Sequence, residues 1–279
     1  MNVEQMERFA KEIRYYTLKE LNYMGYGHYG GSLSIVEALA VIYGKHLNAS
    51  PEIKDDPERD YFVLSKGHGG PSLYATLFLK GYFPEEWLYT LNQNGTSLPS
   101  HPDRNKTPGV DMTTGSLGQG ISAATGIALG NRIAKRNNYT YTIVGDGELN
   151  EGQCWEAIQM AAHQKLDHLI VFVDDNKKQL DGYTADISNP FDFVDKFSAF
   201  GFHAIRVDGN SVQAISEAIT AAKELKGKPS VIVLDTIKGQ GVTYIENMID
   251  NHHLRPDDDT NEAIRTAIQQ IGEELGVTV

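Results

Sequence analysis

The sequence predicts an α/β fold with a mainly parallel sheet and helices on both faces. Two observations carry this prediction. Short apolar runs alternate with stretches of helical periodicity, and each run is apolar throughout rather than at alternate positions. Strands of that kind are typical of a parallel sheet covered by helices on both sides. There is no repeat, no low-complexity linker and no break in composition, so we expect a single domain over residues 1–279.

The first element is expected to be an amphipathic helix over residues 3–24, which ends at Gly25. Ser34 has the character of a helix N-cap for an apolar helix over residues 35–47. Glu37 lies three positions further on and would complete a capping box.

The later elements alternate between strands and helices. Strands are expected over residues 61–64, 141–144, 169–173, 203–207 and 230–235. Helices are expected after Pro71 up to residue 79 and over residues 121–134, 151–164, 191–200, 212–225 and 260–275. Two segments are expected to be loops: residues 92–116, whose length is typical of functional or mobile loops, and a polar loop over residues 240–260 before the closing helix.

Composition excludes several classes of function. The net charge of −12 argues against a nucleic-acid partner, which would want a basic surface. The single cysteine, Cys154, permits no internal disulfide and fits a reducing compartment. The N-terminus lacks the pattern of a signal peptide, and no apolar stretch has the length of a membrane span. We therefore expect an acidic cytoplasmic protein with no membrane association.

Hard oxygen ligands follow two neighbouring strands of the predicted sheet. Asp146 comes just after the strand over residues 141–144, and Asn176 follows the next strand. Both would lie at the carboxyl edge of the sheet, where open α/β folds bind ligands. Gly145 and Gly147 leave the backbone open to a bulky anion. This combination favours Mg²⁺ held against a diphosphate. The alternative for Asp146 is an N-cap of the following helix.

Another glycine pattern, Gly25-Tyr-Gly-His-Tyr-Gly30, matches the dinucleotide fingerprint letter by letter. That fingerprint requires a strand before it and a helix directly after it. Here a long helical pattern precedes the glycines. A nicotinamide dehydrogenase is thus a rival prediction that rests on this match alone, and we interpret the glycines as a tight turn.

Four Gly- or Pro-rich segments each carry histidine, a side chain that can donate, accept and titrate near neutrality. They are Gly27-His-Tyr-Gly-Gly-Ser32, Ser65-Lys-Gly-His-Gly-Gly-Pro71, Leu98-Pro-Ser-His-Pro102 and Asp250-Asn-His-His-Leu-Arg-Pro256. Together with Thr114-Gly-Ser-Leu-Gly-Gln-Gly120, the Gly-Asp-Gly-Glu-Leu-Asn-Glu-Gly run at 145–152 and Thr236-Ile-Lys-Gly-Gln-Gly241, they occur in the order seen in one family. From about residue 15 to about residue 256, the chain resembles the amino-terminal, diphosphate-binding half of a transketolase.

The resemblance implies a thiamine diphosphate-binding fold with thiamine diphosphate and Mg²⁺ as cofactors. It assigns Mg²⁺ coordination to Asp146, Asn176 and the backbone carbonyl of Lys178. Further cofactor contacts are implied for Gly115, Ser116 and Leu117 beside the aminopyrimidine, for Gly145, Gly147 and Glu148 in the metal loop, and for Lys66, His68, Lys238 and His252. Ser116 stands where family members often have proline, and Gly31 where many relatives carry serine.

The catalytic residues implied by the resemblance are His28, His101 and His252, which would grip the donor ketose and assist proton movement. His253 is adjacent to His252, and the choice between them stays open at this point. Glu151 and Glu156 match glutamates that meet across a dimer interface in the family. Their alternative interpretation is a helix-start carboxylate and an exposed charge.

Transketolases activate the cofactor with a glutamate on the next domain, which would lie past residue 279. The chain is therefore interpreted as the N-terminal subunit of a split transketolase, which transfers a two-carbon ketol unit between sugar phosphates, or as a truncated form. The first interpretation predicts a separate C-terminal subunit, an α₂β₂ assembly and no activity alone. Alternatives are a deoxyxylulose-phosphate synthase-like half, a transketolase-like enzyme for an unusual sugar, and a non-enzymatic cofactor-binding subunit.

Overall fold

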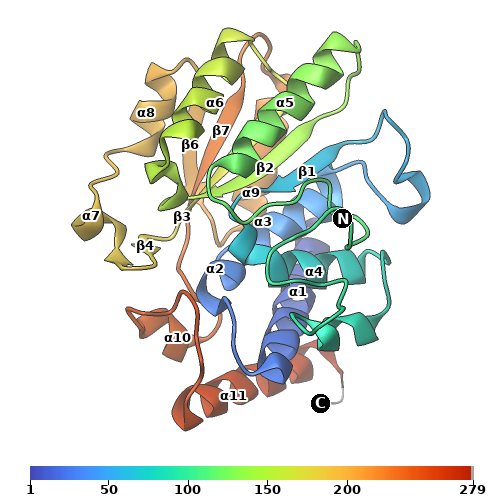
Figure 1. The fold of residues 1–279 in the computed structure, drawn as a ribbon, viewed down its shortest axis with the longest axis vertical. Helices are drawn as coiled ribbons and strands as arrows, with labels where there is room; N and C mark the ends of the chain where they lie inside the picture. The colour runs from blue at the N-terminus through green and yellow to red at the C-terminus, as the bar shows by residue number, and fades with distance from the viewer. Residues whose placement is uncertain (278–279) are drawn as a thin grey trace.

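The computed structural model describes residues 1–277 and contains a five-stranded sheet with the order β1–β2–β3–β7–β6 (Figure 1). All four strand pairs are parallel, which confirms the predicted fold class. The pairing sets Gly145 opposite Asp174, so the chain leaves two neighbouring strands at the same edge. The strands are β1 (Tyr61–Leu64), β2 (Thr140–Gly145), β3 (Leu169–Asp175), β6 (His203–Asp208) and β7 (Ser230–Asp235).

Helices occupy most of the remaining chain. Among the described residues, none of them is both long and apolar enough to cross a membrane. Those before β2 are α1 (Val3–Met24), α2 (Tyr29–Leu33), α3 (Val36–Val41), α4 (Gly70–Leu79) and α5 (Gln119–Ile133). Those after it are α6 (Gly152–His163), α7 (Thr184–Ile187), α8 (Phe193–Ala199), α9 (Val212–Glu224), α10 (Thr243–Asn247) and α11 (Asp258–Leu275). A π-helical turn (Ile42–His46) and a hairpin of β4 (Lys178–Gln179) and β5 (Gly182–Tyr183) complete the regular structure.

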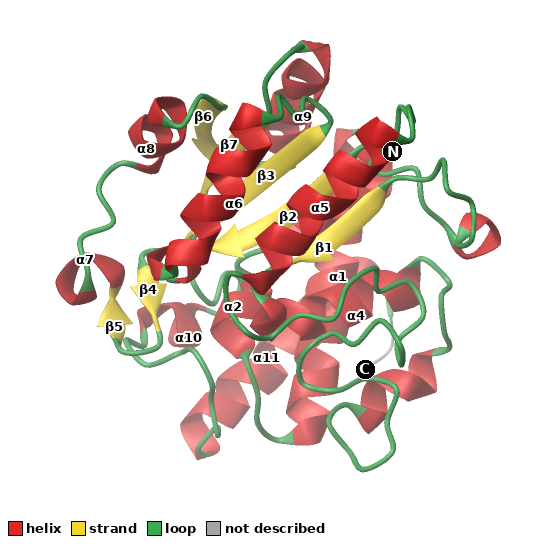
Figure 2. Cartoon of the chain, turned by 45° about the horizontal axis from the view of Figure 1, so that its top comes forward, coloured by secondary structure: helices red, strands yellow, loops and turns green. Residues whose placement is uncertain are grey.

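Alternate residues of each central strand enter different cores, because successive side chains point to opposite faces of a sheet. In β3, Ile170 and Phe172 pack with α1, α3, α4, α9 and α11, whereas Val171 and Val173 pack with α5, α6 and α8. All four side chains are fully buried. Figure 2 shows α5 and α6 crossing the near face of the sheet. Helices therefore cover both faces, as predicted.

A crevice lies at the carboxyl ends of β1 and β2, because the chain leaves these strands toward opposite faces of the sheet. After β1 the chain turns to α4, on the face that also carries α1. After β2 it turns to α6, on the opposite face. Ligands of open α/β sheets bind where neighbouring strands diverge in this way.

The predicted capping box at Ser34 and Glu37 is wrong. Ser34 follows the short α2, and its hydroxyl donates to Asp174 Oδ2 at 2.6 Å instead of capping α3. Glu37 accepts from Arg14 at 2.6 Å, in a pair that is almost fully buried. Tertiary partners outcompete the local cap because both side chains lie in the interior, where an unpaired polar group is costly.

The segment 240–260, predicted to be a polar loop, contains the short helix α10. The buried apolar residue of α10 is Ile245, and one such residue is too few to give a recognisable helical periodicity. The hairpin β4–β5 and the short α7 were also not predicted. The closing helix α11 was predicted, and it begins at Asp258, with Asp257 as its N-cap.

One buried acid in the fold has no partner. Glu20 on α1 is 0% exposed, and neither of its carboxylate oxygens has a hydrogen-bond partner within residues 1–277. Burial raises the pKa of Glu20 well above its ordinary value, because the interior disfavours the charged form.

We expect the wild-type protein to lose stability as pH rises, and we expect Glu20→Gln to remove this contribution to the pH dependence. A carboxyl with a raised native pKa is protonated in the fold at pH values where the unfolded chain has already released the proton. Each pH unit between the unfolded and native pKa then costs about 1.4 kcal/mol of unfolding free energy. Urea unfolding at pH 5 to 8 would show wild type losing more stability than Glu20→Gln as pH rises. Glu7→Gln, at an exposed position of the same helix, is the matched control; equal pH slopes in wild type and Glu20→Gln would contradict this assignment.

Candidate active site

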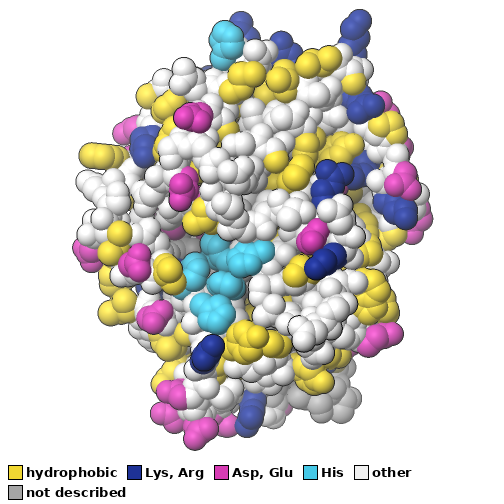
Figure 3. Space-filling model, viewed as in Figure 1, with side chains coloured by type: hydrophobic (Ala, Val, Ile, Leu, Met, Phe, Trp, Pro, Cys, Tyr) yellow, Lys and Arg dark blue, Asp and Glu magenta, His cyan; other side chains and the backbone are white. Residues whose placement is uncertain are grey.

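A cavity of about 380 Å³ lies at the carboxyl edge of the sheet, and Figure 3 shows histidine side chains gathered in a hollow on this face. Residues from all four histidine segments and from the metal signature line it. Those predicted from the sequence are His28, Lys66, His68, His101, Gly115, Leu117, Gly145, Asp146, Gly147, Glu148, Glu151, Asn176, Lys178, Lys238 and His252. Of the predicted residues, Ser116 and Glu156 do not line it.

A buried ion pair forms the floor of the cavity. Lys66, just after β1, donates from Nζ to Asp174 Oδ2 at 2.5 Å and to the Gly31 carbonyl at 2.8 Å. The side chains of Lys66 and Asp174 are 1% and 0% exposed. Lys66 lines the cavity, and its ammonium also ties the end of β1 to β3 and α2.

Asp174 also accepts hydrogen bonds from three neutral side chains. Ser34 and Asn176 donate to Oδ2 at 2.6 and 2.8 Å, and Thr236 donates to Oδ1 at 2.5 Å. Burial alone would raise the pKa of Asp174, but the Lys66 ammonium and these donors outweigh it and hold that pKa below its ordinary value. Asp174 is therefore a structural anion.

The predicted metal ligands converge beside this floor. Asp146 is buried, and its oxygens accept from the Gly147 N–H at 2.7 Å and the Thr184 hydroxyl at 3.2 Å. Burial, and then repulsion by Asp174, raises the pKa of Asp146 to about 7. Asp146 does not cap the next helix, because the N-cap residue of α6 is Glu151. A buried carboxylate that accepts only these two hydrogen bonds within residues 1–277 is suited to binding a cation.

Hydrogen bonds fix both ends of the Asn176 amide. Its amide nitrogen donates to Asp174, which leaves Oδ1 as the acceptor on the other side of the amide, where the Lys178 N–H reaches it at 3.2 Å. Within residues 1–277 no cluster of three His, Cys, Asp or Glu side chains has metal-binding geometry. One carboxylate, one amide oxygen and a backbone carbonyl suit Mg²⁺, which keeps several water or substrate oxygens. The residues present therefore fit Mg²⁺.

Lys238 brings a second positive charge to the cavity. Its ammonium donates to the Lys178 carbonyl at 3.0 Å and lies 3.2 Å from His252 Nδ1. Burial, and then repulsion by Lys66, lowers the pKa of Lys238 to about 8. The Lys178 side chain points elsewhere and donates to the carbonyls of Glu246 and Met248. An anion in the cavity would relieve the repulsion between the lysines.

Bare backbone lines the cavity at two glycines. A Cβ at Gly147 would lie 2.8 Å from the Gln179 Cβ. Gly115 has φ of +146° and lies against His101, so it needs glycine for its conformation as well. At Gly31, where the family resemblance would put a serine, a Cβ would lie 2.7 Å from the His68 ring. Ser32 does not substitute for such a serine, because its hydroxyl donates to the His28 carbonyl at 2.6 Å.

Glu148 lines the cavity, and its carboxylate accepts hydrogen bonds from three separate segments of the chain. Its Oε1 accepts from the Ser65 hydroxyl at 2.5 Å and the Gly118 N–H at 2.8 Å, and its Oε2 accepts from the Gly145 N–H at 3.1 Å. These bonds join the ends of β1 and β2 to the start of α5. Glu151 is exposed at the cavity margin, and Glu156 is exposed on α6 outside it.

Four histidine rings surround His28. The ring centroids of His68, His101, His252 and His253 lie 5.8, 5.4, 5.4 and 4.7 Å from that of His28. His252 lines the cavity and is half-buried, whereas His253 is exposed and does not line it. The geometry therefore favours His252 as the cofactor-side residue and leaves His253 beside His28.

Burial and neighbouring cations keep these rings neutral. Burial, followed by repulsion from His253, lowers the pKa of His28 to about 3, and burial with repulsion from Lys238 does the same for the pKa of His252. Burial also lowers the pKa of His68 and, to a smaller extent, of His101. Neutral imidazoles can donate through one nitrogen and accept through the other, as sugar hydroxyls require.

Four lining residues were not predicted from the sequence: Asn150, Gln179, Leu180 and Asp181. Asn150 lies within the metal-signature run at 145–152. The other three belong to the β4–β5 hairpin, which carries no hydrophobic period, and the signal that could have identified it is the Asp181-Gly182 dipeptide, which marks a turn.

We expect His28→Gln to weaken the acid sensitivity of the fold. A histidine with a lowered native pKa stays neutral in the fold while the unfolded chain takes up a proton. It therefore supports stability above pH 6.5 and loses that support as pH falls toward 3. Between pH 6.5 and 5 this amounts to at most about 2 kcal/mol. Urea unfolding should show a shallower pH slope for His28→Gln than for wild type. His163→Gln, an exposed histidine on α6, is the control; an unchanged slope in His28→Gln would show that His28 already carries its proton in the fold.

Comparison with known proteins agrees with this geometry. The family described as "Transketolase, thiamine diphosphate binding domain" matches residues 5–272. The chain is 49% identical over 269 residues to the 6-deoxy-6-sulfo-D-fructose transketolase subunit SqwG of Clostridium sp. (strain MSTE9), covering 96% of this chain and 97% of the relative. It is 38% identical over 277 residues to an apulose-4-phosphate transketolase subunit of Actinobacillus succinogenes, covering 98% of both.

Solved structures of transketolases contain the same fold. Transketolase from Campylobacter jejuni superposes with a TM-score of 0.90 at 28% identity, and a Pichia stipitis transketolase mutant crystallised with fructose 6-phosphate superposes with a TM-score of 0.88 at 30%. The chain is covered to 99% in both cases but spans only 43% and 44% of those proteins. The chain belongs to the transketolase family, in which it corresponds to the thiamine diphosphate-binding domain.

Proposed function

We propose that this chain is the diphosphate-binding subunit of a split transketolase that transfers a two-carbon ketol unit from a ketose to an aldose. The observation that carries the proposal is the convergence of Asp146, Asn176 and the Lys178 carbonyl with three neutral histidines in one cavity. The full-length match to relatives named as subunits supports the division into separate chains.

In this proposal, Asp146, Asn176 and the Lys178 carbonyl hold Mg²⁺, and the Gly147 backbone approaches the diphosphate. The position of Lys238 beside the Lys178 carbonyl supports a second, cationic contact to the same anion. Gly115 and Leu117 line the aminopyrimidine side of the cavity. Bound thiamine diphosphate supplies the electron sink for the two-carbon carbanion. The chain supplies charge neutralisation and position.

The donor ketose is gripped by His28, His101 and His252. Their depressed pKa values support a role as neutral donors and acceptors toward hydroxyls of the sugar. A neutral imidazole can also take a proton from a hydroxyl and return it, which fits the proton movements of ketol transfer. His68 lies 4.7 Å from His252, centroid to centroid, and supports it from the buried side.

The second subunit supplies what the cavity lacks. In the family, the glutamate that activates the aminopyrimidine belongs to the following domain, so we place it on a C-terminal partner chain. Glu151 and Glu156 are exposed along α6, where they are free to face a second copy of this chain. We therefore propose an α₂β₂ assembly in which Glu151 and Glu156 take part in a shared proton network.

The sugar is the least constrained part of the proposal. Transfer between the usual pentose and hexose phosphates is one candidate. A second is an unusual ketose, because the two full-length relatives are named for 6-deoxy-6-sulfo-D-fructose and apulose 4-phosphate. Phosphate and sulfonate share an anionic terminus, which makes both kinds of ketose candidates for the same site.

We expect turnover only when the chain is co-expressed with its C-terminal subunit. The purified complex, with thiamine diphosphate and Mg²⁺, would be assayed with xylulose 5-phosphate, 6-deoxy-6-sulfo-D-fructose and apulose 4-phosphate as donors and with an aldose phosphate as acceptor. Activity in the complex and none in the single chain supports the split enzyme, and the preferred donor names the sugar. Steady turnover by the single chain would overturn the proposed division.

We expect Asp146→Asn to lower kcat/KM of the complex at least about 100-fold, because it removes the anionic ligand that Mg²⁺ requires. Calorimetry should show weaker binding of thiamine diphosphate at fixed Mg²⁺. Asp186→Asn, at an exposed position on the nearby α7, is the matched control and should bind normally. Undiminished cofactor binding by Asp146→Asn would remove Asp146 from the metal site.

A further inference from the structure

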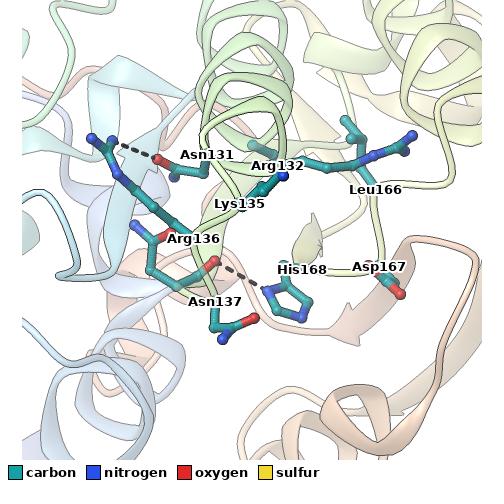
Figure 4. Close-up of a pocket in the computed structure, with 10 residues that line it drawn as sticks. Asn131, Arg132, Lys135, Arg136, Asn137, Leu166, Asp167 and His168 are labelled. Carbon is teal, nitrogen blue, oxygen red and sulfur yellow. Dashed lines mark hydrogen bonds between the residues drawn. The ribbon is translucent and has the colours of Figure 1, made fainter.

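A second cavity lies at the opposite edge of the sheet, where β2 and β3 begin. It has a volume of about 300 Å³, and Figure 4 shows the residues that line it. They come from the end of α5, from the turn over residues 135–138 and from residues 166–168. This is the amino edge of the sheet, and the proposed catalytic cavity is at the carboxyl edge.

Cations dominate the lining in a chain whose net charge is −12. Arg132, Lys135 and Arg136 lie in the last turn of α5 and directly after it, and Asp167 is the acidic residue of the lining. Arg136 has a long contact of 3.5 Å with the exposed Glu58. Arg132 and Lys135 form no ion pair within residues 1–277 and are exposed, so both can swing toward a ligand.

Asn131 holds one of these cations at the cavity. Its side chain is buried, and its Oδ1 accepts from the Arg136 guanidinium at 3.5 Å. This contact keeps the Arg136 charge at the end of α5, where Arg132 and Lys135 also line the cavity.

The neighbouring side chains are held by partners within the protein. Asp167 accepts the Gly227 N–H at 2.9 Å, which occupies part of its carboxylate. His168 stacks on Tyr139 with 4.5 Å between ring centroids, and its Nδ1 donates to the Asn138 carbonyl at 3.3 Å. The three cations are therefore the groups of the lining that can bind an anion.

We propose that this cavity binds a phosphate group, carried by a small phosphorylated metabolite. The guanidinium groups of Arg132 and Arg136, with Lys135, neutralise the dianion. Planar guanidinium groups match the tetrahedral oxygens through paired hydrogen bonds. The volume is at the lower end of the range for small-molecule sites and holds a phosphoryl group with a short carbon skeleton. This binding does not depend on the proposed function.

The test is a titration of the purified chain with inorganic phosphate, followed by backbone amide NMR and calorimetry at constant ionic strength. The expected result is shifts of amides in residues 131–138 and 166–168, with at least tenfold weaker binding at this site in Arg132→Gln/Lys135→Gln. Glycerol 3-phosphate is the second probe; tighter binding than phosphate supports a phosphorylated metabolite, and weaker binding limits the site to free phosphate and overturns that part.

Arg8→Gln/Lys11→Gln is the matched control, since it removes the same charges at the same spacing from the exposed face of α1. It should bind phosphate at the second cavity as wild type does. Equal weakening by both double variants would reduce the effect to net charge and overturn the site. Shifts confined to residues that line the catalytic cavity, such as Asp146 and Lys238, would place all phosphate binding there and have the same consequence.

Discussion

The candidate site depends on the buried ion pair between Lys66 and Asp174. It joins the ends of β1 and β3 to α2, and through Thr236 it includes the segment after β7. Removing one partner of such a pair leaves an uncompensated buried charge, which typically costs about 3–5 kcal/mol. The residues that surround the metal position are thus fixed by a contact that uses up one lysine and one aspartate. Lys238 and Asp146 are further buried charges that line the cavity, and neither is part of this pair.

The position of the site could be predicted from sequence because it follows from strand order. Asp146 and Asn176 come directly after apolar runs, and parallel pairing of those runs sets Gly145 opposite Asp174. The histidine segments were assigned to the same site by resemblance, and the cavity gathers His28, His101 and His252 at the expected edge. Local pattern and overall topology agree here, which is the condition under which sequence reasoning succeeds.

Sequence reasoning failed where long-range contacts override a local signal. Ser34 has the spacing of an N-cap, but Asp174, 140 positions away in sequence, is the acceptor that its hydroxyl meets. Lys66 lines the cavity with the rest of its motif, and only the fold reveals that its ammonium pairs with Asp174. The hairpin around Asp181 has too few apolar residues to show a period. No local pattern in a sequence reports a partner that the fold supplies from elsewhere.

Helix α5 connects the two cavities directly. At its N-terminal end, Gly118 and Ile121 are fixed by Glu148 and Ser65 beside the catalytic cavity. At its C-terminal end it supplies Asn131 to the phosphate cavity. Coupling between two binding equilibria is reciprocal. Any change that cofactor binding makes in phosphate affinity must therefore appear, by the same factor, as a change that phosphate makes in cofactor affinity.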